Sequence, residues 1–168
     1  MPAEIITERL TLGEWHAEDL PAYTAMMNER DSRTASAPRG GFVDEPVAQA
    51  RLTQRRRELA DTGIALLAVR VEGAFAGYCG LTVGHASLNE PEIAYELVQR
   101  FQGRGYGTEA AQAVVAAAAQ TGRRRLWASV RTWNLPSLRV LAKTGFTATN
   151  RQVTDRSGHM VWWTRVLE

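Results

Sequence analysis

The sequence Gln102-Gly103-Arg104-Gly105-Tyr106-Gly107 joins a segment with the pattern of a β-strand to a segment with the pattern of a helix. Residues 92–98 (EIAYELV) precede it, and the alanine-rich residues 108–121 follow it and end at Gly122. A glycine-rich turn in this setting exposes backbone N–H groups at the positive end of the helix dipole. Glycine also lets an anion approach the backbone closely. The turn therefore predicts an anion site, and a tight connection without a ligand is the alternative.

Two familiar phosphate-binding motifs need residues that this turn lacks. A P-loop ends in Gly-Lys-Ser/Thr, whereas Thr108 follows Gly107 with no lysine between them. A dinucleotide-binding motif needs an acidic residue about 20 positions further on to bind the ribose. The corresponding stretch here is basic and contains Arg123, Arg124 and Arg125. The remaining candidate is a pyrophosphate ligand with additional negative charge, and coenzyme A, with its pyrophosphate and 3′-phosphate, fits this description.

The formal net charge of +2 hides an uneven distribution of charge along the chain. Residues 1–109 carry 11 basic and 16 acidic side chains, whereas residues 110–154 carry seven basic side chains and no acidic ones. The region that follows the glycine-rich turn is therefore suited to an anionic ligand, and the acidic N-terminal region to a cationic partner. For any single arginine, dispersed surface charge that only keeps the protein in solution is the alternative.

Length and composition predict one globular domain over residues 1–168, since 45% of the residues are hydrophobic and 23% are charged. No apolar run approaches the roughly 18 residues of a membrane span, and the start of the chain lacks the features of a signal peptide. We therefore expect a cytoplasmic protein with no membrane partner. Cys79 is the only cysteine and the three histidines are scattered, so we expect no disulfide and no metal site.

The period of the apolar residues predicts the other secondary-structure elements. Strands are expected at residues 5–12, 64–71, 76–83, 92–98 and 126–131, with a closing pair from residue 146 onward. Helices are expected at residues 19–30, 45–61, 108–121 and 134–144, and the longest loop at residues 31–45. This order of elements predicts an α/β (α+β) fold in which a mixed sheet is flanked by helices.

Several motifs around the glycine-rich turn occur together. The turn has the form Gln102-x-x-Gly105-x-Gly107, and it is followed by residues 127–131, Asn134-x-x-Ser137 and Lys143-x-Gly145-Phe146. In this order they resemble the GNAT superfamily of N-acetyltransferases. Thr7-Glu8-Arg9-Leu10-x-Leu12 and Ile93-Ala94-Tyr95 are similar to its ribosomal-protein N-acetyltransferase branch. The resemblance is strongest over residues 92–146 and implies a single-domain fold with a mostly antiparallel sheet of six to seven strands and about four helices.

The resemblance also implies acetyl-CoA as cosubstrate and a set of residues that bind it. Backbone amides of the turn are implied to bind the pyrophosphate, at Gln102, Gly103, Arg104, Gly105, Gly107 and Thr108. The preceding strand splays from its neighbour in this family, so the backbone of Leu97 and Val98 is implied to pair with pantetheine and to polarise the thioester carbonyl. Asn134 is implied to contact the pantetheine arm, and an ordinary helix N-cap is the alternative that does not exclude this contact.

Acetyl transfer requires a neutral amine, and an α-amino group with a pKa of about 7.7 to 8.0 loses its proton more easily than a lysine with a pKa of about 10.4. Glu92, Ala94 and Glu96 alternate onto one face of their strand, so two carboxylates are expected near the amine. Glu92 is the preferred base, because family members often place a base at this position. Glu96, water, or a role for both glutamates in substrate binding or at the surface are the alternatives.

The leaving thiolate has a pKa of about 8.5, so an acid assists its departure without being compulsory. Many GNAT enzymes supply a tyrosine four residues before the Gly-Phe pair, and Leu141 occupies that position here. Attention therefore moves to Ser137, which the ribosomal-protein branch also carries near the thiol. Ser137 is expected to hold or reprotonate the sulfur, and a serine that satisfies a backbone N–H in the first turn of a helix is the alternative.

These residues together predict an enzyme that transfers acetyl from acetyl-CoA to a primary amine by direct attack in a ternary complex. A protein N-terminal α-amino group is the first choice of acceptor, and a small amine such as an amino acid, polyamine or antibiotic is the second. A non-catalytic acyl-CoA-binding regulator is an alternative of another class. A nucleic-acid partner for Arg123 to Arg125 is not favoured. A monomer or a homodimer is expected, and Trp15 and residues 39–42 are candidates to line the acceptor pocket.

Overall fold

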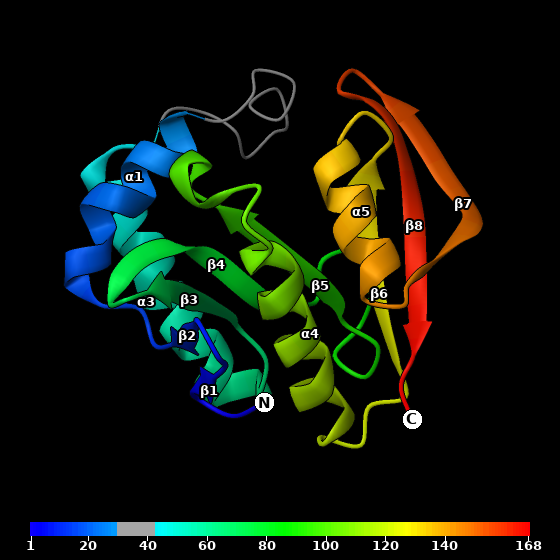
Figure 1. Cartoon of the computed structure of the whole chain (residues 1–168), viewed down its shortest axis with the longest axis horizontal. Helices are drawn as coiled ribbons and strands as arrows, with labels where there is room; N and C mark the ends of the chain where they lie inside the picture. Colours follow the sequence, from blue (N-terminus) through cyan, green and yellow to red (C-terminus); the bar gives the residue numbers. More distant parts are fainter. Residues whose placement is uncertain (30–42) are drawn as a thin grey trace.

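One sheet of eight strands runs through the part of the chain that the computed structural model describes, residues 1–29 and 43–168 (Figure 1). Its strand order is β1-β2-β3-β4-β5-β6-β8-β7, and only the β5–β6 pair is parallel. The strands are β1 Ile5–Ile6, β2 Thr11–Gly13, β3 Leu66–Val71, β4 Ala74–Thr82, β5 Glu92–Leu97, β6 Arg125–Arg131, β7 Thr147–Asp155 and β8 Gly158–Val166. The mixed, mostly antiparallel sheet is therefore confirmed, with one strand more than the larger predicted number.

The extra strand arises because residues 5–12 form a hairpin and not the single strand that their apolar pattern predicts. The Thr7 N–H donates to the Leu10 carbonyl at 2.9 Å, and the Leu10 N–H donates to the Thr7 hydroxyl at 3.0 Å. These two bonds reverse the chain between β1 and β2, which then pair antiparallel with each other.

Four α-helices lie in the described ranges, as predicted: α1 Leu20–Asn28, α3 Glu45–Thr62, α4 Tyr106–Ala119 and α5 Leu135–Lys143. The Asp44 carboxylate caps α3 at the Val47 N–H, and Gly63 ends it in a left-handed conformation. Helix α4 begins two residues earlier than predicted, directly after Gly105. None of the helices in the described part is long and apolar enough to cross a membrane. Most of the predicted loop, residues 31–42, lies outside the described residues.

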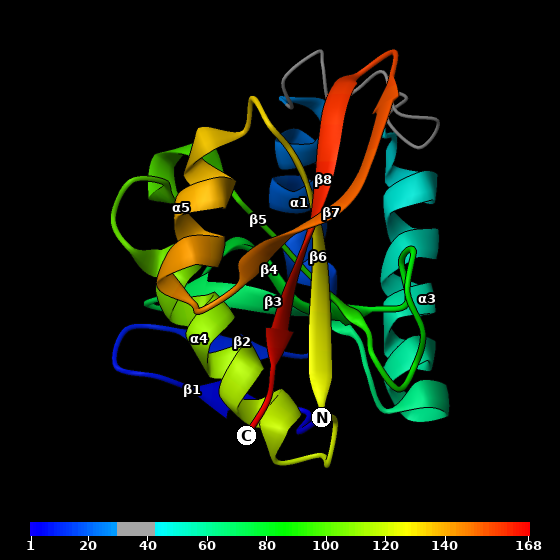
Figure 2. The ribbon, with the colours of Figure 1, turned by 90° about the vertical axis from the view of Figure 1, so that its right-hand side faces the viewer.

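Helices cover both faces of the sheet, α4 and α5 on one side and α1 and α3 on the other (Figures 1 and 2). The first face buries an apolar cluster in which the small side chains of Ala110, Val114 and Ala118 let α4 lie close to the strands. The second face buries a cluster around Trp15 and Tyr23. Because each helix pair is fixed to the sheet by its own core, the strands between them are held rigidly.

The sheet opens between β5 and β6, its fifth and sixth strands. Strands β5 and β6 are paired at one register position, Glu92 opposite Trp127, where the Trp127 N–H donates to the Pro91 carbonyl. Beyond this position no further register pair joins the two strands, although β5 continues its pairing with β4 as far as Leu97. Backbone groups of β5 that face β6 are therefore left without a strand partner beyond the first residues.

Candidate active site

Two adjoining pockets lie where β5 and β6 separate. The turn pocket, of about 340 Å³, lies between the glycine-rich turn, the end of β5 and the face of α5. The strand pocket, of about 240 Å³, lies between β5, β6 and the start of α5, with Ser157 and Met160 at its edge. Both pockets are lined by Tyr95, Asn134 and Ser137. These three residues therefore mark the junction between the two spaces.

The glycine-rich turn supplies the turn pocket with backbone donors. Gly103 and Gly105 have φ values of 74° and 86°, a left-handed conformation that most other residues avoid. The first helical bond of α4 is donated by Glu109 to the Gly105 carbonyl. The preceding N–H groups, including those of the pocket-lining Gly107 and Thr108, consequently have no partner within the helix. The start of α4 therefore has the donors and the dipole of an anion site.

Two cationic side chains face the same pocket from α5. Arg139 and Lys143 are four residues apart, so they lie on one face of the helix, and both line the turn pocket. Neither forms an ion pair with a carboxylate of the described residues. They belong to the basic stretch of the sequence but were absent from the predicted site. Their four-residue spacing beside the motif Lys143-x-Gly145-Phe146 was the signal that could have found them.

The end of β5 offers less free backbone than expected. The Val98 N–H donates to the Ala76 carbonyl at 2.9 Å, and the Val98 carbonyl accepts the Phe101 N–H, so this residue is engaged on both sides. Because antiparallel pairing alternates, Tyr95 and Leu97 direct their backbone groups away from β4 and toward the opening. The Leu97 carbonyl accepts a bond from the Gln102 side chain at 2.8 Å. The Leu97 N–H thus faces the opening, whereas both backbone groups of Val98 are bonded within the protein.

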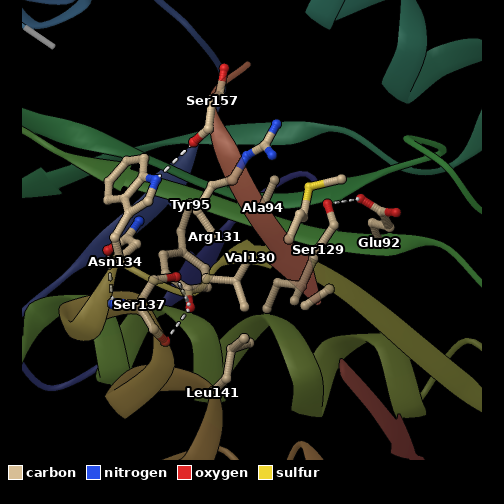
Figure 3. A pocket seen from close by; sticks show the side chains of 14 residues that line it. Glu92, Ala94, Tyr95, Ser129, Val130, Arg131, Asn134, Ser137, Leu141 and Ser157 are labelled. Carbon is tan, nitrogen blue, oxygen red and sulfur yellow. Dashed lines mark hydrogen bonds between the residues drawn. The ribbon is translucent and has the colours of Figure 1, made fainter. Parts of the chain in front are cut away.

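A tyrosine and a serine form the junction of the pockets (Figure 3). The Tyr95 hydroxyl can donate its one proton to Ser137 Oγ at 2.9 Å, which leaves the serine proton free, or to the Ser137 carbonyl at 3.1 Å. The Asn134 side chain accepts the Ser137 N–H at 3.2 Å and so caps α5. Burial raises the pKa of the Tyr95 phenol above its ordinary value, although the bond to Ser137 opposes this effect. Tyr95 was not among the predicted site residues, and it stays protonated over the physiological range.

The carboxylate of Glu92 is buried and doubly bound. One oxygen accepts the main-chain N–H of His85 at 3.1 Å. The other accepts the Ser129 hydroxyl at 3.1 Å (Figure 3). Glu96 lies on the same face of β5 but lines the turn pocket and accepts a bond from Tyr78 at 2.9 Å. Four residues of a strand span about 13 Å. The structure therefore does not bring the two predicted carboxylates together.

The outer edge of the strand pocket is held by contacts between distant segments. Arg131 of β6 forms an ion pair with Asp155 at 2.8 Å and donates to the Gly158 carbonyl at 2.8 Å. The Trp133 indole donates to the Ser157 carbonyl at 3.0 Å. The hydrogen bond from Arg131 holds the pKa of the Asp155 carboxyl below its ordinary value. These bonds fix the tip of the β7–β8 hairpin beside the start of α5.

A comparison with known families identifies the family to which the chain belongs. The family model described as acetyltransferase (GNAT) domain matches residues 9–147, most of the chain. The chain belongs to the GNAT acetyltransferase family. The family match and the N-acetyltransferase names of the relatives support an acyl-CoA-dependent N-acetyltransferase.

Relatives and solved structures agree with this family. An uncharacterized N-acetyltransferase of Mycobacterium tuberculosis is 32% identical over 132 residues, which cover 77% of this chain and 82% of the relative. The ribosomal L7/L12 α-N-protein acetyltransferase RimL, solved with coenzyme A, has a TM-score of 0.82 at 16% identity and 98% coverage of both chains. The microcin C7 self-immunity acetyltransferase MccE, solved with acetyl-CoA and AMP, has a TM-score of 0.81 at 16% identity, with 99% of this chain and 98% of that chain covered. At this identity, the last two show a shared fold.

The surroundings of three further residues show whether each belongs to a pocket or to the core. Leu141 is 1% exposed and lines the strand pocket. An apolar side chain therefore lies where many GNAT enzymes have a tyrosine hydroxyl. Trp15 is 2% exposed and donates to the Leu66 carbonyl at 2.7 Å, which makes it a core residue and not an acceptor-pocket residue. Cys79 is fully buried in the core, and burial raises the pKa of its thiol. Residues 39–42 lie outside the described residues.

Proposed function

We propose that this GNAT enzyme acetylates the N-terminal α-amino group of a protein or peptide, with coenzyme A in the turn pocket and the acceptor amine in the strand pocket. The observation that carries the proposal is the junction of the two pockets at Tyr95 and Ser137. A donor and an acceptor that enter from opposite sides would meet there. Direct transfer then needs no covalent intermediate with the protein.

The turn pocket fits the phosphates of coenzyme A. The unpaired N–H groups at the start of α4 face a pocket whose other wall carries Arg139 and Lys143. An added Cβ at Gly107 would lie 3.6 and 3.7 Å from Leu97 and Val140, which line the same pocket, so glycine leaves that space to a ligand. We propose that these amides and cations bind the pyrophosphate and the 3′-phosphate. The acetyl thioester that coenzyme A carries would then extend toward β5.

The opening between β5 and β6 is where the thioester and the amine would react. The Leu97 N–H, which faces the opening, donates to the thioester carbonyl and stabilises negative charge on its oxygen. The amine nitrogen attacks the carbonyl carbon, the carbon–sulfur bond breaks, and the amine proton leaves to Glu92 or to water. Ser137, held by Tyr95, donates a hydrogen bond to the departing thiolate. Burial of Tyr95 keeps its proton in place, so the pair acts by hydrogen bonding.

The environment of Glu92 favours an α-amine as acceptor. Among the described residues, Glu92 is the only acidic residue that lines the strand pocket, and both of its oxygens already accept a hydrogen bond. Glu92 is therefore the one carboxylate in the described lining of this pocket that can take a proton, and a strongly basic amine would have to give up its proton there before it attacks. At pH 7 the neutral fraction of an α-amine is about 300 times that of a lysine, from ordinary pKa values of about 7.8 and 10.4. An acceptor that is partly neutral already suits this site.

A matched pair of peptides tests the acceptor. One peptide has a free N-terminus and no lysine, and the other differs from it only in an acetylated N-terminus and one internal residue replaced by lysine. We expect thiol release from acetyl-CoA, and a mass increase of one acetyl group at the terminus, with the first peptide alone. A small-amine panel of amino acids, polyamines and aminoglycosides runs beside it. Turnover with a small amine and with neither peptide would make small-molecule acetylation the function.

A further inference from the structure

The turn between β1 and β2 is bonded to the first turn of α4, 100 residues further along the chain. The Glu109 carboxylate accepts the Thr7 hydroxyl at 2.6 Å, the Arg9 N–H at 3.0 Å and the Arg9 Nε at 2.7 Å. Arg9 Nη2 also lies 2.6 Å from the same carboxylate. The guanidinium covers the ring of Tyr106, 4.7 Å from its centroid. Thr7 and Arg9, from the motif Thr7-Glu8-Arg9-Leu10, thus contact residues of the glycine-rich turn and of the first turn of α4.

Glu109 is an unexpected residue at this position. A carboxylate in the first turn favours the helix but repels an anion that binds to the same helix end. Tyr106 and Glu109 are three residues apart and share a helix face, whereas Gly107 and Thr108 line the turn pocket. Desolvation raises the pKa of Glu109, but the bonds from Thr7 and Arg9 outweigh it and leave the pKa below its ordinary value. Glu109 is therefore ionised at neutral pH, directed away from the pocket and neutralised by Arg9.

Arg9 also orients the glycine-rich turn itself. Its Nη1 donates to the Arg104 carbonyl at 3.1 Å, so this oxygen points toward Arg9. A carbonyl oxygen that turned into the pocket would oppose a phosphate. The next residue, Gly105, is left-handed, and a Cβ there would lie 3.3 Å from Arg9 Nη2. The guanidinium thus packs against the turn without lining the pocket itself.

We propose that Arg9 is a positioning residue for coenzyme A, which neutralises Glu109 and holds the Arg104 carbonyl so that the turn presents only N–H groups to the pyrophosphate. This inference rests on the proposed binding of the pyrophosphate at the turn. Arg9 does not touch the ligand in this account. Its contribution appears in the affinity for coenzyme A and not in the chemical step.

Charge-neutral substitutions test the inference through a double-mutant cycle. We expect Arg9→Gln to raise the dissociation constant of coenzyme A, measured by titration calorimetry, about tenfold, with kcat at saturating acetyl-CoA changed less than twofold. Glu109→Gln should bind at least as tightly as the wild type. The double variant, in which the uncompensated charge is gone, should recover to within about threefold. A double variant as weak as Arg9→Gln would overturn the neutralising role.

Two controls separate this effect from instability and from loss of one positive charge. Arg56→Gln removes an arginine of α3, on the face of the sheet opposite to α4 (Figure 1), whose carboxylate partner Glu14 lies 3.2 Å from Arg56 Nε, and should leave the affinity unchanged. Arg9→Lys keeps the charge but loses the forked contact with Glu109 and Arg104, and should weaken binding about threefold. If Arg9→Gln does not fold, Arg9→Lys and the double variant carry the test. Wild-type affinity in Arg9→Lys, together with a weak double variant, would refute the proposal.

Gly105→Val distinguishes failure of this inference from failure of the proposed function. A β-branched residue is strained at a φ of 86° and should abolish binding of coenzyme A. If Gly105→Val binds normally, the turn does not hold the pyrophosphate and the proposed site is wrong. If Gly105→Val fails to bind while Arg9→Gln binds like the wild type, only the role of Arg9 is wrong.

Discussion

Replacement of Ser137 by alanine tests the proposed role of its hydroxyl in the departure of the thiolate. The substitution spares the N-cap of α5, because Asn134 binds the backbone N–H of Ser137 and not its side chain. It removes the hydroxyl that lies 2.9 Å from Tyr95. A hydrogen bond to a charged group contributes about 1.5 to 3 kcal/mol, which corresponds to about 10- to 150-fold in rate. We expect kcat to fall within this range.

The affinity and the pH profile of Ser137→Ala sharpen the test. The pyrophosphate contacts at α4 are unchanged, so KM for acetyl-CoA should move less than threefold. A serine hydroxyl does not titrate, and burial keeps Tyr95 protonated. The profile of kcat between pH 6 and 9 should therefore keep its shape at a lower level.

The assay is thiol release from acetyl-CoA with a saturating acceptor peptide, and single-turnover measurements confirm that the chemical step is affected. Tyr95→Phe is the companion variant, which retains the serine but removes its orienting partner, and it should lose about tenfold in kcat. A Ser137→Ala enzyme with kcat within threefold of the wild type would refute the assignment. Loss of an ionisation from the profile would instead assign proton transfer to this pair.

Three further predictions concern charged residues. Glu92→Gln, which can still bind the main-chain N–H of His85, should lower kcat about sevenfold at pH 7, the share of an α-amine with a pKa of about 7.8 that is still protonated there, and should recover as the amine deprotonates at higher pH; an unaltered pH–rate profile would exclude Glu92 as the base. Arg139→Gln and Lys143→Gln should each raise KM for acetyl-CoA about threefold to tenfold at unchanged kcat, with a smaller effect in 0.5 M salt; salt-independent KM values would contradict phosphate binding. Because the pKa of Glu109 is lowered in the folded state, its contribution to stability is present above its unfolded pKa of about 4.3 and is lost as the pH falls through the folded value. The melting temperature of Glu109→Gln should consequently fall less than that of the wild type between pH 6 and 3, and parallel curves would contradict this linkage.

Local signals in the sequence were sufficient to predict most elements and their order along the chain. The strand before the glycine-rich turn, the helix after it and the Asn134 cap all depend on residues close together in the chain. The hairpin at residues 5–12 was missed because the reversal depends on the Thr7 side chain, which bonds the Leu10 N–H within an otherwise apolar pattern. A side-chain bond of this kind leaves no mark on hydrophobic periodicity.

Partners in the site were harder to predict, because they are set by packing. Alternation along β5 placed Tyr95 opposite to Glu92, but its contact with Ser137 spans 42 residues and requires α5 to lie across the opening of the sheet. Alternation also placed Glu92 and Glu96 on one face without revealing that the rise of the strand puts them in different pockets. The Arg9–Glu109 pair spans 100 residues and was likewise beyond the reach of sequence patterns.

A crystal structure of the enzyme with coenzyme A and a peptide carrying a free N-terminus tests the central claim most directly. We expect the pyrophosphate to lie within about 3.2 Å of backbone N–H groups of Gly105 to Thr108, a normal hydrogen-bond distance. We also expect the sulfur of coenzyme A to lie beside Ser137 and the terminal nitrogen of the peptide to lie in the strand pocket. Coenzyme A bound away from the glycine-rich turn, or a peptide terminus that does not enter between β5 and β6, would contradict it.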